Sequence, residues 1–280
     1  MIQINSELPN CMLDLNNKLN EYDFVLFHLY ESNKRYREYY LNQRKSHPDR
    51  WMIFDNSAYE YFVKGEVLDL QKYFEAICEL QPDLFILPDV LMDKEKTITG
   101  IEEFLNNYGV RILEYAPNSR PLAVAQGKTS ADLIDCLKLY KSMGLERVAI
   151  PFHNSFFKIK ATVTNWNEEQ IILNWHNSTL ITEDNMYALG RIKFVRENYD
   201  LLKSFIYVHF LGSHDPIEKV FYKEFDSMDT GYPVKCAIEG FELGKEPHKP
   251  NVIIDEFLDK DLDKNMIDLI DRNVSIFRNM

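Results

Sequence analysis

Three apolar runs in the chain are each followed by a carboxylate or an amide, namely Asp55, Asp89 and Gln126, and a fourth segment carries Asp226 and Asp229. If these runs are parallel strands of a barrel, their carboxyl ends meet on one face, where the active sites of that fold are built. Acids grouped there can perform glycosyl transfer, because one carboxylate attacks the anomeric carbon while another moves the proton. An Asp after a strand is also a common turn former or helix N-cap, so a purely structural role stays open for each of them.

The elements that would position these residues alternate along the chain. The expected strands are Val25–Tyr30, Trp51–Phe54, Leu84–Leu87, Leu122–Ala125, Arg147–Pro151, Ile206–Leu211 and Ser227–Thr230. The expected helices are Leu68–Leu80, Lys94–Tyr108, Ser130–Met143, Thr182–Lys203, Pro216–Phe225 and Asp255–Phe277. Gly109 and Gly144 are expected to end the second and third of these helices. Repeated strand-then-helix units indicate a parallel sheet, and seven strand candidates favour a (β/α)8 TIM barrel over an open sheet.

The composition fits one domain over residues 1–280, with an inserted loop at about 153–184 and a helical tail at about 255–280. No two of the 10 glycines lie closer than four positions apart, which excludes the GxGxxG dinucleotide fingerprint and the GxxxxGK[ST] phosphate loop. The four cysteines form no CxxC pair, and there is no HExxH or GxSxG motif, so zinc-ribbon, metalloprotease and serine-hydrolase functions lack support. No metal ligand set is predicted.

Several segments together resemble the tRNA-guanine transglycosylase family, including its phage-type relatives that insert 7-deazaguanines into DNA. They are Phe54–Tyr59, Leu87–Asp89 with Asp93, Val124–Gly127, Phe210–Pro216, and Phe225–Thr230 followed by Pro233. The resemblance runs from Trp51 to Gly240, and the segments follow the family's order.

The resemblance implies a reaction and the residues that perform it. Guanine in a polynucleotide is exchanged for a 7-deazaguanine base of the preQ0 type through a covalent glycosyl-aspartate, without a cofactor. Asp229 is then the nucleophile, and Asp55 the general acid/base. Asp89 and Gln126 bind the base edge, and Gly212 also binds the base, from the turn that resembles the family's L-G-x-G-x-P motif.

Three aromatic residues are candidates for stacking on a flipped base. They are Tyr59, Phe152 and Phe210. Ordinary packing is the alternative for each of them, since most aromatic side chains serve the core.

The chain also departs from the family's pattern. Ser57 and Ala58 stand where the family has two glycines, Ile150–His153 replaces its glycine-rich base-binding loop, and Cys236 stands alone where a zinc cluster would begin. The absence of the zinc site favours DNA over tRNA as the substrate.

Contacts with nucleic acid require local positive charge, because the chain as a whole carries 32 basic and 44 acidic residues, a formal charge of −12. Basic residues interleaved with tyrosines could supply it after the first strand, and two lysines of the inserted loop could extend them. The residues are Lys34, Arg35, Arg37, Arg44, Lys45, Arg50, Lys158 and Lys160. A solvated amphipathic helix is the alternative for the 34–50 segment.

The N-terminal residues lack the features of a signal peptide, and no apolar run is long enough for a membrane span. We therefore expect a cytoplasmic protein, in the host cytoplasm if it is phage-encoded, and leave a homodimer open. Three other functions also stay open: a tRNA-guanine transglycosylase of the queuine or preQ1 type that lacks zinc, a glycoside hydrolase of a small substrate, and a noncatalytic partner subunit.

Overall fold

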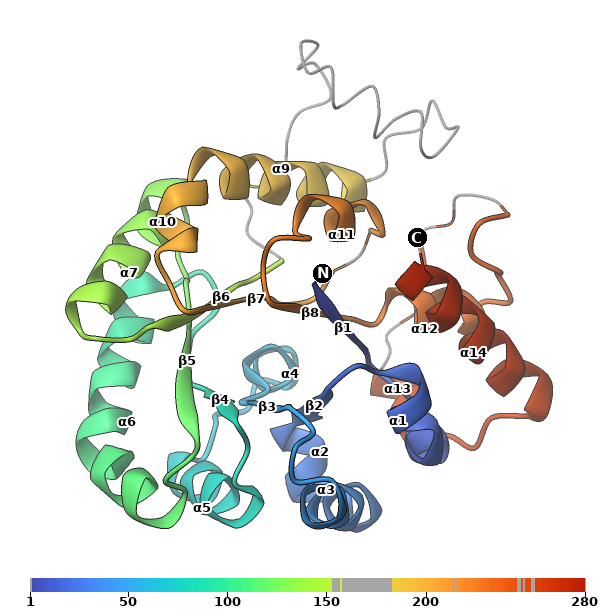
Figure 1. Cartoon of the computed structure of the whole chain (residues 1–280), viewed down its shortest axis with the longest axis horizontal. Coiled ribbons are helices and arrows are strands. Elements are labelled where there is room, and N and C mark those ends of the chain that lie inside the picture. Colours follow the sequence, from blue (N-terminus) through green and yellow to red (C-terminus); the bar gives the residue numbers. More distant parts are fainter. Residues whose placement is uncertain are drawn as a thin grey trace. The chain divides into compact units, whose positions relative to one another are not determined.

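The computed structural model describes residues 2–152, 157, 183–213, 215–245, 248, 250–252 and 255–279 (Figure 1). Eight parallel strands form one sheet in the order β1-β8-β7-β6-β5-β4-β3-β2, and helices alternate with them. The predicted (β/α)8 TIM barrel is therefore confirmed, as is the helical C-terminal tail. None of the helices within these ranges is long and apolar enough to cross a membrane.

The strands are short and largely buried. Their bounds are β1 Gln3–Ser6, β2 Asp23–Leu26, β3 Met52–Asp55, β4 Leu84–Ile86, β5 Arg120–Val124, β6 Arg147–Ile150, β7 Tyr207–Phe210 and β8 Ser227–Thr230. Every residue of β2, β4 and β8 is buried, as expected for parallel strands that are covered on both faces.

Along the chain, each strand is followed by one or more helices. Their bounds are η1 Asn10–Leu15, α1 Asn16–Leu19, α2 Phe27–Ser32, α3 Lys34–Ser46, α4 Ala58–Lys64, α5 Leu70–Leu80, α6 Lys94–Tyr115, α7 Ser130–Ser142, α9 Glu183–Glu197, α10 Tyr199–Lys203, α11 Ile217–Phe221, α12 Tyr232–Ile238, α13 Asp255–Leu258 and α14 Lys264–Asn279.

Several of the expected element boundaries are wrong, and the strand β1 was not among those expected. The first expected strand ends at Leu26, and its remaining residues form α2, because a short buried apolar run fits either a strand or a helix. The helix expected to end at Gly109 continues to Tyr115. Burial of Ile112 on its inner face offsets the roughly 1 kcal/mol that a mid-helix glycine costs. Gly144 does follow the end of α7 with φ +76°, as predicted.

The chain divides into two compact units. The central unit comprises Tyr22–Pro151 and Ser204–Val208, and the terminal unit comprises Met1–Glu21, Phe152–Lys203 and His209–Met280.

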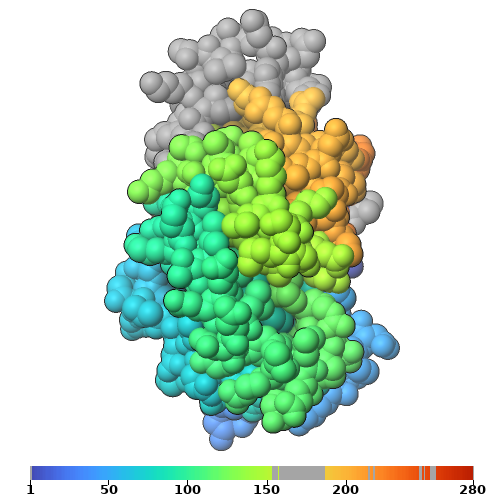
Figure 2. Space-filling view, turned by 90° about the vertical axis from the view of Figure 1, so that its left-hand side faces the viewer, coloured from blue at the N-terminus to red at the C-terminus, as the bar shows by residue number. Residues whose placement is uncertain are grey.

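In the central unit, α5, α6 and α7 lie side by side outside β4 and β5 (Figure 1). Figure 2 looks onto the exposed outer surfaces of α6 and α7. Aromatic rings fill the space beneath these helices, with Tyr73 in contact with the rings of Phe27, Phe54 and Phe104. The Tyr73 hydroxyl donates a hydrogen bond of 2.7 Å to the carbonyl of Ile86, which satisfies its buried polar end. The carboxyl ends of β3 and β4 are thereby fixed from outside.

In the terminal unit, a fully buried ion pair joins α9 to α11. Arg191 Nε donates to Glu218 Oε1 at 2.7 Å, and Arg191 Nη1 donates to the carbonyl of Leu211 at 2.6 Å. Glu218 also accepts from Ser213 Oγ at 2.8 Å and from the Tyr222 hydroxyl at 3.1 Å. The pair thus fixes the turn that follows β7.

Removal of one partner of this pair should destabilise the protein strongly. We expect Arg191→Met to lower the free energy of unfolding by about 3–5 kcal/mol, because Glu218 is then left as an unpaired buried charge. Urea unfolding followed by circular dichroism measures this loss.

The matched control is Lys193→Met on the same helix, where the side chain is 42% exposed and the change should cost less than about 0.5 kcal/mol. Equal stability of the two variants would show that the buried pair does not support the fold.

Candidate active site

Polar side chains gather at strand ends in two places, one in each unit. The Asp89 cluster comprises Asn56, Asp89 and Gln126 in the central unit. The Asp229 cluster comprises His209, Gly212, Ser227 and Asp229 in the terminal unit. Each cluster contains residues predicted from the sequence together with others that the sequence did not single out.

In the Asp89 cluster, two side-chain amides hold one carboxylate. Asn56 Nδ2 donates to Asp89 Oδ1 at 2.8 Å, and Gln126 Nε2 donates to Asp89 Oδ2 at 2.7 Å. Asn56 Nδ2 also donates to the carbonyl of Leu87, and the backbone N–H of Met92 donates to Gln126 Oε1 at 3.0 Å. The three side chains come from the loops after β3, β4 and β5, so the structure brings Asp89 and Gln126 together as predicted.

The environment of Asp89 changes its acidity. Burial raises the pKa of this carboxyl above its ordinary value, and the hydrogen bonds from Asn56 and Gln126 act in the opposite direction. Each carboxylate oxygen has room for two hydrogen bonds, and each receives one from an amide. The group can therefore accept N–H donors from the edge of a base.

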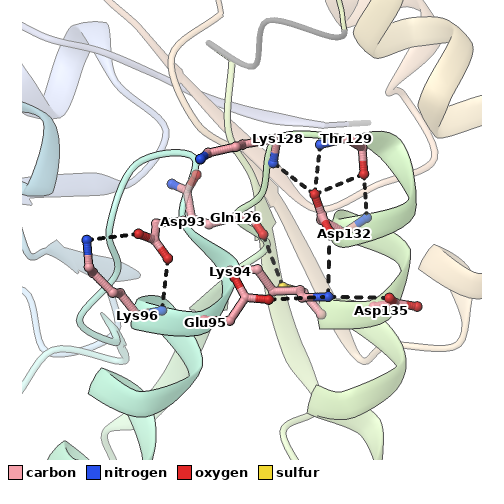
Figure 3. Close-up of polar contacts among 10 residues, drawn as sticks. Asp93, Lys94, Glu95, Lys96, Gln126, Lys128, Thr129, Asp132 and Asp135 are labelled. Atoms are coloured by element: carbon pink, nitrogen blue, oxygen red, sulfur yellow. Dashed lines mark hydrogen bonds and ion pairs between the residues drawn. The ribbon is translucent and has the colours of Figure 1, made fainter.

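The loop that carries Gln126 is fixed by a capping box at the start of α7 (Figure 3). Asp132 Oδ2 accepts hydrogen bonds from the backbone N–H groups of Lys128 and Thr129 at 3.0 and 2.9 Å. A Cβ added at Gly127 would lie 2.2 Å from the Cβ of Asp132, so a side chain cannot fit there without movement of this loop.

Lys94 of α6 links this capping box to the preceding helix. Its Nζ lies 3.5 Å from Asp132 Oδ1 and 3.5 Å from Asp135 Oδ2 (Figure 3). Behind the loop, Cys136 Sγ donates to the carbonyl of Gln126 at 3.2 Å. The backbone at Gln126 is therefore held by the capping box that follows it and by Cys136 of α7.

Asp55 ends β3 and begins a tight turn. Its Oδ2 accepts from the backbone N–H of Ser57 at 2.9 Å. Ser57 has φ +59° and ψ +34°, a left-handed conformation that glycine adopts without steric cost. Its hydroxyl accepts from the backbone N–H of His28 at 3.2 Å and lies 2.9 Å from His28 Nδ1. These hydrogen bonds hold a strained residue between Asp55 and α4.

In the Asp229 cluster, a buried carboxylate receives two donors. The side chain of Asp229 is 4% exposed, and its Oδ1 lies 3.0 Å from His209 Nε2. The backbone N–H of Gly212 lies 3.1 Å from both Oδ1 and Oδ2. Gly212, predicted to bind the base, thus binds the predicted nucleophile.

Two hydrogen bonds join the turn that carries the Gly212 N–H to β8, one at Asp229 and one at Thr230. The backbone N–H of Ser213 donates to the carbonyl of Asp229 at 2.9 Å, and Thr230 Oγ1 donates to the carbonyl of Ser213 at 2.6 Å. Gly212 itself has φ +62°, which the sharp turn requires. These two hydrogen bonds therefore hold the turn that carries the donor against the strand that carries the carboxylate.

His209 also contacts Ser227, whose Oγ lies 2.7 Å from His209 Nδ1. The three residues Ser227, His209 and Asp229 resemble a hydrolase triad in composition only. Ser227 and His209 are fully buried, so the serine cannot meet a carbonyl substrate. Of these three side chains only the Asp229 carboxylate keeps any exposure, 4%, and a carboxylate can itself act as a nucleophile.

The three predicted stacking residues differ in exposure. Tyr59 on α4 is 54% exposed. Phe152 is buried beneath the Arg191 guanidinium, whose carbon lies 4.8 Å from the ring centroid. Phe210 is fully buried and stacked on Tyr222 at 3.8 Å. As placed, Phe152 and Phe210 pack in the terminal unit, and Tyr59 presents its ring to solvent.

The basic segment around α3 is largely paired with acids. Arg37 pairs with Glu79 at 2.6 Å, Arg44 with Asp83 at 3.0 Å, Arg50 with Asp23 at 2.8 Å and Lys34 with Glu38 at 3.6 Å. The interleaved Tyr36 and Tyr40 are buried, whereas Arg35 and Lys45 are exposed. Fewer positive charges are thus available for phosphates than the sequence count suggests. Lys158 and Lys160, with most of the predicted insert at 153–184, lie outside the described residues.

The sequence reasoning missed three members of the two clusters, Asn56, His209 and Ser227, and also Arg191, which fixes the turn after β7. Asn56 directly follows Asp55, and its amide signals a turn, which could have marked it. His209 and Arg191 are polar residues inside apolar segments, a pattern that indicates buried hydrogen-bonded groups but does not reveal their partners.

Comparison of the sequence with models of protein families finds no match, and comparison with curated proteins also finds none. The functional conclusion below therefore depends on the residues of the two clusters.

The strain at Ser57 can be measured with a pair of variants. Ser57→Ala and Ser57→Gly both lose the hydroxyl that bonds His28, but only the glycine relieves the left-handed conformation. We expect Ser57→Gly to be more stable than Ser57→Ala by about 1 kcal/mol in urea unfolding.

The control is the same pair at Lys138, an exposed residue inside α7, where alanine should be the more stable by about 1 kcal/mol. The same order at both positions would mean that Ser57 carries no strain.

Proposed function

We propose that the protein is a base-exchange transglycosylase. It replaces guanine in a polynucleotide, DNA in preference to tRNA, with a 7-deazaguanine base of the preQ0 type. The observation that carries the proposal is the Asp229 carboxylate on β8, buried and held by His209 Nε2 at 3.0 Å and Gly212 N at 3.1 Å. A carboxylate fixed in this way can attack a sugar carbon without the need for a separate base.

In the first half of the reaction, the target guanine leaves the base stack and enters the site. Asp229 Oδ2 forms a bond to C1′ as the bond from C1′ to N9 of guanine breaks, and the electron pair leaves on N9, which takes the proton of the Asp55 carboxyl. Asp89 accepts N–H groups of the base edge, while Asn56 and Gln126 keep its carboxylate in place. The product is a glycosyl ester on Asp229.

In the second half, a 7-deazaguanine takes the place of guanine. Asp55 accepts the proton from N9 of the incoming base as N9 attacks C1′, and the ester oxygen leaves as the Asp229 carboxylate. Two inversions at C1′ give net retention.

A second candidate is a retaining glycoside hydrolase of a small substrate. The observation that favours it is the pairing of Arg37, Arg44 and Arg50 with acids, which reduces the charge available to a polynucleotide. Asp229 as nucleophile and Asp55 as acid/base would perform this reaction as well, with water in place of the incoming base.

Nucleoside analysis tests the proposed function. The protein is incubated with duplex DNA, single-stranded DNA or tRNA and with preQ0, preQ1 or isotopically labelled guanine. The polymer is then digested to nucleosides and analysed by mass spectrometry. We expect the new base in DNA, and a loss of at least about 10³-fold in the rate for Asp229→Ala.

The matched control is Asp226→Ala, which removes an acid three positions earlier and should leave the exchange rate within a few-fold of wild type. No exchange by the wild type on any polymer, or undiminished exchange by Asp229→Ala, would contradict the proposal. Exchange confined to tRNA would identify the RNA-directed alternative, and release of sugar from small glycosides would identify the hydrolase.

A further inference from the structure

His209 is a buried imidazole that the reaction steps above do not use. It lies on β7 directly opposite Ser227 of β8 in the parallel register. Because side chains on one face of a strand recur every second residue, Asp229 shares the face of Ser227. The imidazole can therefore reach both residues, with Nδ1 2.7 Å from Ser227 Oγ and Nε2 3.0 Å from Asp229 Oδ1.

The partners of the ring determine where its proton lies. An ionised carboxylate only accepts hydrogen bonds, so the Nε2 that faces Asp229 carries the proton. In the neutral ring Nδ1 is then an acceptor, and the Ser227 hydroxyl donates to it. A hydroxyl can donate or accept, so the carboxylate sets the tautomer and the Ser227 hydroxyl satisfies the other ring nitrogen.

The contacts to the carboxylate are unequal. Oδ1 accepts from His209 Nε2 and shares the Gly212 N–H, whereas Oδ2, within the described part of the chain, accepts only from the shared N–H. Arg191, a buried cation of the same unit, is neutralised by Glu218. The hydrogen bond from His209 Nε2 fixes the carboxylate plane at Oδ1, and the other oxygen keeps a lone pair for attack.

We propose that His209 is a positioning residue for Asp229: the carboxylate requires the Nε2–H form, Ser227 satisfies Nδ1, and the hydrogen bond from Nε2 fixes Oδ1 and leaves Oδ2 as the attacking atom. This role rests on the proposed function. Loss of the Nε2–H lets the carboxylate turn about its Cβ–Cγ bond, and misplacement of a reacting atom by about 1 Å can cost about 10²-fold in rate.

Two amide variants separate this role from simple packing. In His209→Gln, the side-chain nitrogen can occupy the place of Nε2 and donate to Asp229. In His209→Asn, the shorter side chain places its amide near the position of Nδ1, facing Ser227. We expect His209→Gln to keep kcat within about 10-fold of wild type and His209→Asn to lose about 10²-fold, with KM for DNA and for the incoming base nearly unchanged.

The melting temperatures of the two variants provide the folding control, since both replace the ring with a neutral amide. Equal losses of kcat in both variants, or wild-type kcat in His209→Asn, would overturn the positioning role. A loss that appears in KM alone would overturn it as well, because the carboxylate acts on bound substrate.

Nitrogen NMR tests the tautomer without any substrate. Histidine labelled with ¹⁵N gives two-bond proton–nitrogen spectra in which the tautomer of each ring can be read, and His209→Gln identifies the signal by its loss. We expect the Nε2–H form in the wild type and also in Ser227→Ala, because the Asp229 carboxylate accepts from Nε2 in both proteins.

Different results would overturn the proposed function and the positioning role of His209. Absence of exchange by the wild type would overturn the proposed function, and the role of His209 with it. Exchange by the wild type together with an Nδ1–H ring would overturn the role of His209 alone.

Discussion

An ionised carboxylate buried at a strand end must receive hydrogen bonds, because an unpaired buried charge costs several kcal/mol. In the terminal unit this constraint links one contact to the next. Asp229 needs the N–H of Gly212, and the turn that carries this group is tied to β8 through Ser213. The same turn directs the Leu211 carbonyl to Arg191, which in turn requires Glu218. The geometry of the proposed nucleophile therefore depends on a buried ion pair that does not touch it directly.

The two clusters satisfy their carboxylates with different donors, and the difference suits different tasks. Asp89 is held by two neutral amides, one on each oxygen, and retains lone pairs for the edge of a base. Asp229 is held mainly through Oδ1, by an imidazole and a backbone N–H. Oδ2 of Asp229 accepts fewer hydrogen bonds than Oδ1 and keeps more lone-pair capacity. The way each carboxylate is held thus supports the roles that the sequence resemblance implies for them.

The sequence predicted seven of the eight strands because most of them are short apolar runs, whereas β1, whose residues are mostly polar, was not predicted. Asp55, Asp89 and Gln126 were predictable for the same reason, since polar residues end those runs. His209 was not, because its role depends on the register of β7 against β8, which joins residues 18 and 20 positions apart. The pairing of the α3 arginines was also hidden, since Glu79 lies 42 positions from Arg37. Local patterns thus located strand ends, while contacts between distant residues decided what the side chains do.

The most direct test of the account is to trap the covalent intermediate. Guanine-containing DNA is incubated with the protein in the absence of an incoming base, quenched with acid and separated under denaturing conditions, and the adduct is digested to peptides for mass analysis. The account predicts a protein–DNA adduct whose sugar is attached to the peptide that contains Asp229. Base exchange without any adduct, or an adduct on a peptide that contains Asp55 or another acid, would contradict it.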